Sequence, residues 1–181
     1  MKNRCQMNRL AMVGIIMAIT VWLAAPVSAK ECEELRDLDD GQLAEKISEM
    51  QKILDQNPSD CEILKCIGIA YHRMASKDAK MYAPKAVETL TKALEANKKD
   101  YQTMCYLGSA TTMMAKNTWN PMKKMGYVNK GAGLMDKAIR KDPDNISVRM
   151  TRAYNSKSLP SFLNRGHLAV EDFEYLADLI E

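Results

Sequence analysis

Apolar residues recur along most of the chain with the spacing of an amphipathic α-helix. In residues 130–141 the apolar face comprises Leu134, Met135, Ala138 and Ile139, and charged residues occupy the opposite face. Pro143 cannot continue a helix and disfavours helical geometry at the residue before it. The pattern therefore predicts a helix that ends next to Pro143.

The same apolar pattern precedes four stop positions. Small or apolar residues lie 12, 8 and 5 positions before each stop: Ala86, Leu90 and Ala93 before Lys98; Gly131, Met135 and Ala138 before Pro143; Ala169, Phe173 and Leu176 before Glu181; and, at the last two offsets, Met50 and Ile53 before Pro58. The stops are 40, 45 and 38 residues apart. This period is typical of stacked helix pairs and predicts an all-α fold, a short α-solenoid of antiparallel pairs.

Helix-start and helix-end residues divide the periodic part into segments. The predicted segments are an N-terminal helix over about 33–57 and three helix pairs over about 58–98, 99–143 and 144–181. Asp40 is expected to cap the first helix, and Ser59 or Asp60 the second. Pro84 is expected at a helix start after a loop over 76–83, and residues 115–129 are expected to form the longest insertion.

Residues 1–29 have the features of a secretory signal peptide. Basic residues precede an apolar run over 10–25, and Val27-Ser28-Ala29 offers a small-residue cleavage site. An uncleaved anchor is the alternative, but this run of 16 residues is shorter than the about 20 that span a bilayer. We therefore expect an exported protein, periplasmic or extracellular, whose mature domain is residues 30–181.

Removal of the signal peptide would change the net charge of the protein. The chain has 26 basic and 23 acidic residues, and the segment 1–29 contains three of the basic residues and no acidic one. The mature chain would therefore have 23 of each, which gives no reason to expect nucleic acid as a partner.

Four cysteines lie beyond the signal segment: Cys32, Cys61, Cys66 and Cys105. An even number in an exported protein permits two disulfides, and buried thiols are the alternative. A bond between Cys61 and Cys66 is disfavoured within one helix, because five residues of helical rise separate the Cα atoms by about 8 Å. Cys32 is therefore expected to pair with Cys61 or Cys66.

The helix pairs share a motif. In the first pair it consists of Leu64, Ile67, Gly68 and Tyr71, followed by Ala86, Leu90 and Ala93; the second pair has Met104, Leu107, Gly108 and Thr111; the third has Arg152 and Ala153. The motif resembles that of tetratricopeptide repeats, W-x2-L-G-x2-Y and then A-x3-F. The resemblance covers residues 33–181, although each pair is longer than the usual repeat and the third is diverged.

The resemblance implies a concave groove lined by the first helix of each pair. By repeat position, its residues are Glu62, Lys65, Ile69, His72, Arg73, Gln102, Cys105, Ser109, Thr112 and Met113. Family members that clamp a C-terminal carboxylate place Asn four residues after Lys, whereas Ile69 follows Lys65 here. An extended peptide is therefore the expected ligand, and a solvated face without a ligand is the alternative.

The long turns within the pairs are a second candidate surface, because they should project from one edge. Their aromatic, methionine and basic residues resemble a contact surface: Met81, Tyr82, Trp119, Met122, Lys123, Lys124, Met125, Tyr127, Phe162 and Arg165. Alternatively, the loops fold back and Trp119 and Phe162 cover the ends of the core.

Catalysis is not expected. Neither His72 nor His167 has a carboxylate or nucleophile at a spacing that suggests a triad, and the sequence has no phosphate loop, CxxC or HExxH. Cys105 with Met104, Met113 or Met114 could suit Cu(I). Methionine at helical spacing is more typical of core packing, so no metal or cofactor is expected.

These features predict a non-enzymatic scaffold that binds protein or peptide partners in the cell envelope. The alternative is an accessory solute-binding component of a periplasmic uptake system, which needs an enclosed apolar pocket. A diverged last repeat could also leave an apolar end that pairs with another copy, as a homo-oligomer.

Overall fold

The chain is helical throughout the residues that the computed structural model describes, which are 32, 34–35 and 37–179. The predicted signal peptide, 1–29, lies outside them. This described part contains no strand and has seven α-helices and two short 3₁₀ helices: α3 Asp40–Gln56, α4 Cys61–Ala75, α5 Ala79–Ala96, α6 Tyr101–Met113, η1 Met114–Asn117, α7 Pro121–Lys141, α8 Ile146–Ser158, η2 Ser161–Leu163 and α9 Gly166–Asp178. The predicted all-α class is confirmed.

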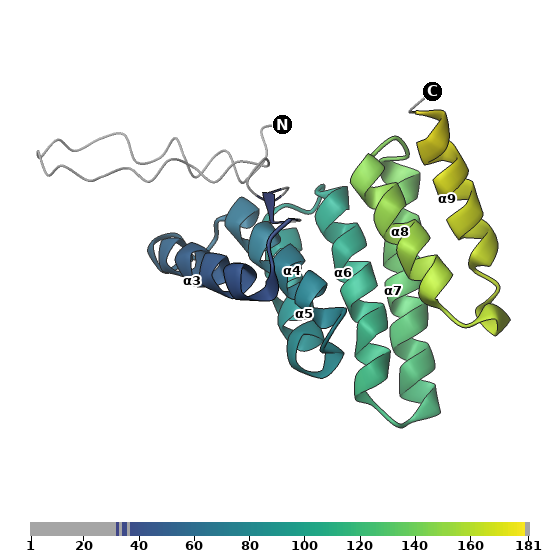
Figure 1. The fold of residues 1–181 in the computed structure, drawn as a ribbon, viewed down its shortest axis with the longest axis horizontal. Helices are drawn as coiled ribbons and strands as arrows, with labels where there is room; N and C mark the ends of the chain where they lie inside the picture. Colours follow the sequence, from purple (N-terminus) through teal and green to yellow (C-terminus); the bar gives the residue numbers. More distant parts are fainter. Residues whose placement is uncertain (1–31, 33, 36, 180–181) are drawn as a thin grey trace, which may run out of the picture.

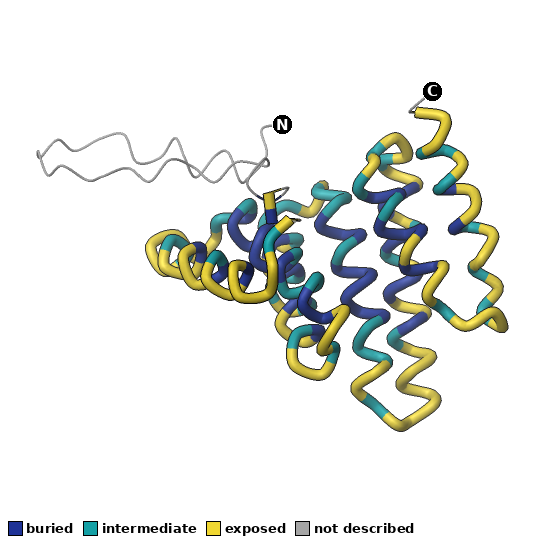
Figure 2. Tube along the Cα trace, in the orientation of Figure 1, coloured by how far each residue is buried: buried dark blue, intermediate teal, exposed yellow. Residues whose placement is uncertain are grey.

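From α4 to α9 the helices follow one another across the molecule and run mostly between the top and the bottom of Figure 1, whereas α3 lies across that direction. The most extensive contacts join α4 to α5, α6 to α7 and α8 to α9, as the predicted pairs require. The helix α6 also contacts α4 and α8, so the first helices of the three pairs are neighbours. Buried residues follow the sides of the helices that face one another (Figure 2).

Short polar side chains fix where five of the helices begin. The side chains of Asp60, Asp78, Asp100, Asn120 and Asn145 each accept a hydrogen bond from a backbone N–H of the following first turn. Such caps satisfy amides that have no partner inside the helix.

The first helix has a different cap from the one expected. Asp39, and not Asp40, accepts from the amide of Gln42, and the Gln42 side chain accepts from the amide of Asp39. This reciprocal capping box satisfies two amides at once, which explains the shift by one residue. Of the two candidates for α4, the cap is Asp60.

Two predicted loops are wrong, because both are largely helical. The helix α5 starts at Ala79, so most of the expected loop over 76–83 is helix and Pro84 lies inside α5 instead of at its start. The helix α7 starts at Pro121, so the insertion over 115–129 shrinks to a short connection. Asn120 accepts from the amides of Met122 and Lys123, and proline is favourable at a first helical position.

Most of the predicted core positions are buried; the exceptions are Ile53 in α3, which is partly buried, and two positions near the C-terminus. Ala86, Leu90, Ala93, Gly131, Met135 and Ala138 are all buried between paired helices. In α9 only Ala169 of the three repeat positions is buried, whereas Phe173 and Leu176 are partly exposed. No later described helix covers the outer side of α9.

Glycines set the distance between paired helices. A Cβ atom added at Gly108 would lie 2.6 Å from the backbone oxygen of Gly131, and one at Gly68 would lie 2.6 Å from the Leu90 side chain. Contacts this short do not occur between real atoms, so any larger residue would push α7 away from α6.

We expect the substitution Gly108→Ala to lower the free energy of unfolding by at least about 2 kcal/mol, because the new methyl group meets a backbone oxygen that cannot move alone. Gly133→Ala is the matched control: it lies in α7, an added Cβ there meets nothing within 4 Å, and alanine should raise stability by up to about 1 kcal/mol. Urea denaturation followed by circular dichroism measures both. Equal stability of the two variants would contradict the close approach.

A buried ion cluster joins α9 to α8. The Asp172 carboxylate has no solvent exposure and accepts from Arg149 Nη1 at 2.9 Å and from Arg152 Nε at 2.7 Å. Burial alone would lower the pKa of Arg152, but the hydrogen bonds and charges of Asp172 and Glu171 raise it overall. Arg152 stands where the earlier pairs have Ile67 and Leu107, so an ion pair replaces apolar packing in the third pair.

Replacing Asp172 by Asn should destabilise the protein by about 3 kcal/mol, because it leaves two buried guanidinium groups without their shared carboxylate. Glu171→Gln removes the same charge from a half-exposed partner of Arg152 and should cost about 1 kcal/mol or less. Thermal and urea unfolding of the two variants test this difference. The cluster would be unimportant if both variants unfolded like the wild type.

Candidate functional site

A hollow of about 550 Å³ lies on the face formed by α4, α6 and α8. Its side chains come from all three helices and from the segment before α3: Cys32, Leu35, Lys65, Ile69, Ala70, His72, Arg73, Ser76, Gln102, Tyr106, Ser109, Thr112, Met113, Lys116, Ser147, Met150, Thr151, Tyr154, Asn155, Ser158 and Leu159. We call this hollow the groove pocket.

Equivalent positions of the three pairs line the groove pocket. Gly68, Gly108 and Ala153 are the small residues of the predicted motif, and the residues that follow them directly are Ile69, Ser109 and Tyr154. All three line the pocket, and so do Arg73, Met113 and Ser158, which lie five positions after the small residues. A shared offset gives these side chains a shared direction, because each helix turns by the same angle per residue.

Most of the predicted groove residues lie together at this pocket. Those that line it are Lys65, Ile69, His72, Arg73, Gln102, Ser109, Thr112 and Met113. Cys105 does not line it: its side chain is fully buried and its thiol donates to the carbonyl of Val148 at 3.4 Å. Burial raises the pKa of the Cys105 thiol, so it is a protonated core residue.

The pocket residues that the third helix pair contributes were not predicted from the sequence. Met150, Tyr154 and Asn155 line the pocket from α8, although that helix keeps the repeat motif poorly. Counting from Ala153, the small residue of the third pair, would have found Tyr154.

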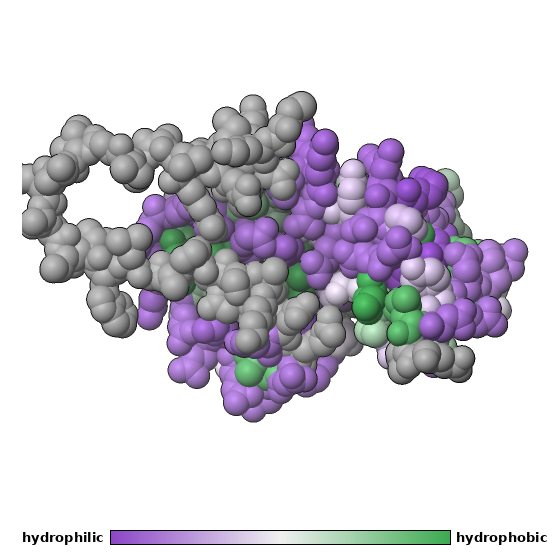
Figure 3. Space-filling view, turned by 90° about the horizontal axis from the view of Figure 1, so that it is seen from above, coloured by the Kyte–Doolittle hydropathy of each residue, from purple (hydrophilic) through white to green (hydrophobic). Residues whose placement is uncertain are grey.

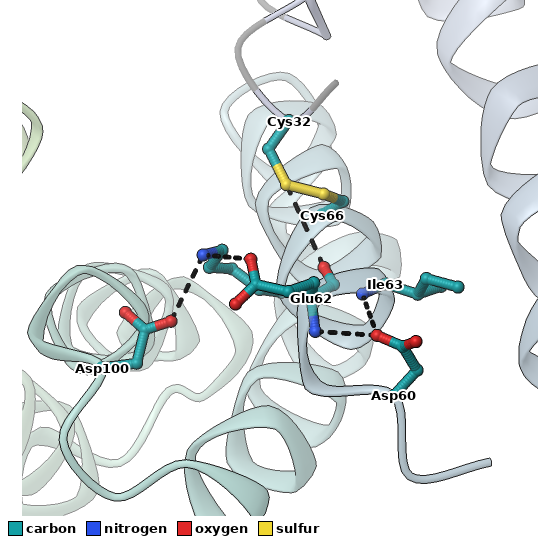
Figure 4. The surroundings of a disulfide bond; sticks show 7 residues. Cys32, Asp60, Glu62, Ile63, Cys66 and Asp100 are labelled. Carbon is teal, nitrogen blue, oxygen red and sulfur yellow. Dashed lines mark hydrogen bonds and ion pairs between the residues drawn. A yellow bond between two sulfur atoms is a disulfide. The ribbon is translucent and has the colours of Figure 1, made fainter. Parts of the chain in front are cut away.

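The segment before α3 forms one wall of the pocket. A disulfide joins Cys32 to Cys66 with a Cα–Cα distance of 4.9 Å (Figure 4), which is one of the two pairings expected. The guanidinium of Arg73 donates to the carbonyls of Leu35 and Leu38. A covalent bond and two charge-assisted hydrogen bonds therefore hold this segment against α4.

Polar side chains from three helices meet at the base of the pocket. His72 Nε2 and Ser109 Oγ are hydrogen-bonded at 2.8 Å, and Asn155 Nδ2 donates to Thr112 Oγ1 at 2.6 Å and to Ser109 Oγ at 3.1 Å. Asn155 Oδ1 is buried and has no partner among the described residues. This oxygen is therefore an unsatisfied acceptor in the interior and is not accessible from the pocket.

The contact between His72 and Ser109 was not visible in the sequence, because the two residues are 37 positions apart. Burial lowers the pKa of His72 to about 4, so its imidazole is neutral near pH 7. In the described part of the chain no carboxylate is hydrogen-bonded to His72, whereas a catalytic Ser–His pair uses such a group to orient its base.

The buried cations at the pocket are neutralised by the protein itself. Lys65 Nζ lies 2.7 Å from Glu62 Oε2 and 3.4 Å from Asp100 Oδ2, between α4 and the start of α6 (Figure 4). Burial alone would lower the pKa of Lys65, but Asp100 and Glu62 raise it overall. Two lining cations have no ion pair among the described residues: Arg73, whose guanidinium donates to backbone carbonyls, and Lys116 at the exposed rim.

The predicted turn residues divide into exposed and packed groups. Trp119, Phe162, Lys123 and Lys124 are exposed, so Trp119 and Phe162 do not cover the core. Tyr82 stacks on Tyr71 with a centroid distance of 6.3 Å, Tyr127 is partly buried, and Arg165 donates to Asp136 at 2.6 Å and 3.0 Å.

No protein-family model matches this chain, and no curated protein is similar to its sequence. None of the described helices combines the length and the apolar character that crossing a membrane requires. Among the same residues, no group of three or more His, Cys, Asp or Glu side chains is arranged to hold a metal ion.

The depressed pKa of His72 makes stability depend on pH. Unfolding restores the ordinary pKa of about 6.5, so the unfolded chain binds the proton more tightly than the folded one does. The contribution of His72 is complete above pH 6.5 and is lost as the pH falls toward 4, by about 3 kcal/mol in total.

This loss can be isolated with glutamine, which cannot take up the proton. His72→Gln should flatten the pH dependence of unfolding between pH 6.5 and 4, whereas His167→Gln, at the exposed other histidine, should leave it unchanged. Denaturant unfolding at several pH values, with NMR titration of the His72 ring, provides the measurement. A titration midpoint near 6.5 would show that the ring is solvated.

Proposed function

We propose that this chain is an exported, non-enzymatic scaffold related to tetratricopeptide repeat proteins, and that its three helix pairs form a short α-solenoid. Its groove pocket binds an extended peptide segment of a protein partner in the cell envelope. The observation that carries this proposal is the use of equivalent offsets in all three pairs to line one hollow. Repeat proteins use surfaces built in this way for recognition.

The chemistry of the pocket suits a peptide. Ile69, Met113 and Met150 provide apolar contacts, and Tyr106 and Tyr154 add aromatic surface. An extended peptide also presents backbone N–H and C=O groups, and polar side chains that line the pocket, such as Gln102 and Ser147, can hydrogen-bond to them. Because His72 is neutral and Lys65 is paired internally, apolar fit and hydrogen bonds select the ligand more than charge does.

The disulfide supports export. Disulfides persist in oxidising compartments and are rare in the cytosol, and Cys32–Cys66 lies shortly after the predicted cleavage site. Together with the features of a signal peptide, it supports a mature domain in the periplasm or outside the cell.

A second candidate function is the binding of a small solute, as an accessory component of an uptake system. The pocket volume of about 550 Å³ lies within the range of small-molecule sites, about 300–1,000 Å³. Three helices and a disulfide-bonded segment surround it, which gives more enclosure than a flat groove.

A displayed library of random peptides separates the two functions. We expect the purified protein to enrich peptides with shared apolar positions, and Met150→Glu to weaken their binding by at least tenfold, because it places a charge among apolar contacts. Ile146→Glu is the control, since Ile146 is exposed on the same helix and does not line the pocket. Isothermal titration calorimetry measures affinity, and circular dichroism verifies that both variants fold.

The peptide function is wrong if no peptide is enriched, or if both variants bind enriched peptides as the wild type does. A rise in melting temperature with amino acids, sugars or small carboxylic acids, lost in Met150→Glu alone, would favour the solute-binding function instead.

A further inference from the structure

The three turns within the helix pairs lie along one edge of the molecule, at the bottom of Figure 1. We call residues 76–85, 114–127 and 157–165 the turn edge. Asn117 Nδ2 donates to the carbonyl of Ala79 at 3.1 Å, which ties the second turn to the first. The first two turns are thus joined directly, and the third is held to α7 by the bonds of Arg165 to Asp136.

Exposed apolar side chains are concentrated at the turn edge. It contains five of the nine large hydrophobic residues that are exposed in the described structure: Met81, Met125, Met122, Phe162 and Trp119. Trp119 is 95% exposed and Met122 is 82% exposed, and the two residues lie three positions apart in the second turn. The part of the opposite edge that is visible in Figure 3, seen from above, is mainly hydrophilic with small apolar patches.

The turn edge is also strongly basic. It carries eight basic residues, Lys77, Lys80, Lys85, Lys116, Lys123, Lys124, Lys157 and Arg165, and one acidic residue, Asp78. Asp78 caps α5, while Lys77 and Arg165 have carboxylate partners. From residue 101 to residue 135 the sequence contains no acidic residue at all. This excess is local, because residues 30–181 carry equal numbers of basic and acidic residues.

We propose that the turn edge docks on the surface of an anionic lipid membrane. Tryptophan prefers the interface between head groups and acyl chains, and lysine can lay its aliphatic stem on apolar surroundings while its ammonium contacts lipid phosphates. Lys124 Nζ lies 5.8 Å from the centroid of the Trp119 ring, so one tip presents both groups. The attraction of each basic residue to an anionic surface adds to that of the others, which makes several lysines together effective.

The composition favours lipid over a protein partner at this edge. Protein–protein interfaces are depleted in lysine, whereas six of the turn edge's lysines have no carboxylate partner among the described residues. Its exposed apolar side chains are distributed over all three turns, with three of them in the second, and Met81, Trp119, Met122 and Phe162 line neither the groove pocket nor any other described hollow. Exposed side chains of this kind fit between head groups without a complementary surface.

The emission of Trp119 reports on docking directly. The chain has two tryptophans, so Trp22→Phe in the full chain leaves Trp119 as the sole emitter. With vesicles of phosphatidylcholine and roughly one-third phosphatidylglycerol we expect a blue shift, and quenching by brominated acyl chains. Vesicles of phosphatidylcholine alone should give little change, and high salt should reverse the effect. The double substitution Lys123→Glu with Lys124→Glu should weaken vesicle binding by at least tenfold.

The matched control reverses two exposed charges on the opposite edge, Lys98→Glu with Lys99→Glu, and should bind vesicles nearly as the wild type does. An equal loss in both variants would mean that net charge alone drives binding and would overturn the proposal. So would sedimentation with vesicles while Trp119 emission stays unchanged, because contact would then be elsewhere. Peptide binding in the groove pocket should be the same in all these variants, so this proposal and the proposed function can fail separately.

Discussion

Close approach of paired helices at positions without a side chain determines the geometry of this molecule. The Gly108 position lies against the backbone oxygen of Gly131, and Leu90 covers Gly68. The residue after each small position, Ile69 or Ser109, is rotated by about 100° around the helix and lines the groove pocket. Packing between the pairs and the shape of the pocket are therefore coupled: a change that separates α6 from α7 also moves Ser109.

In the third pair, buried ion pairs hold the two helices together. Ala153 keeps the small position, but Arg149 and Arg152 on α8 hold Asp172 of α9 in a region without solvent. Arg149 also lies over the ring of Tyr175, 3.7 Å from its centroid. Buried ion pairs add less net stability than apolar packing of the same volume, because the charges must be desolvated. Their strict geometry instead gives α9 one preferred position on α8.

Helical periodicity predicted the all-α class and the buried faces of most helices, because both depend on which side chains are buried. It could not place the start of α7, since residues 121–126 are exposed and carry no apolar face. The side chain of Asn120 caps this first turn. A single capping residue is a weaker sequence signal for a helix start than a repeated apolar pattern. The partner of Arg152 was equally hidden, because a tertiary contact between α8 and α9 leaves no local pattern.

The two surfaces differ in how the protein treats charge. Lys65 and Arg73 lie at the groove pocket, yet Glu62 and Asp100 neutralise the first and the carbonyls of Leu35 and Leu38 occupy the second. These cations hold α4 to the start of α6 and to the N-terminal segment, so they shape the pocket and are not free for a charged ligand. Two lysines of the turn edge make comparable internal contacts, Lys77 with Asp40 and Lys85 over the rings of Tyr71 and Tyr82. The other five have no such contact with another helix among the described residues. Because charge acts over about a Debye length while apolar fit requires contact, long-range attraction at the turn edge can orient the molecule before the pocket meets its ligand.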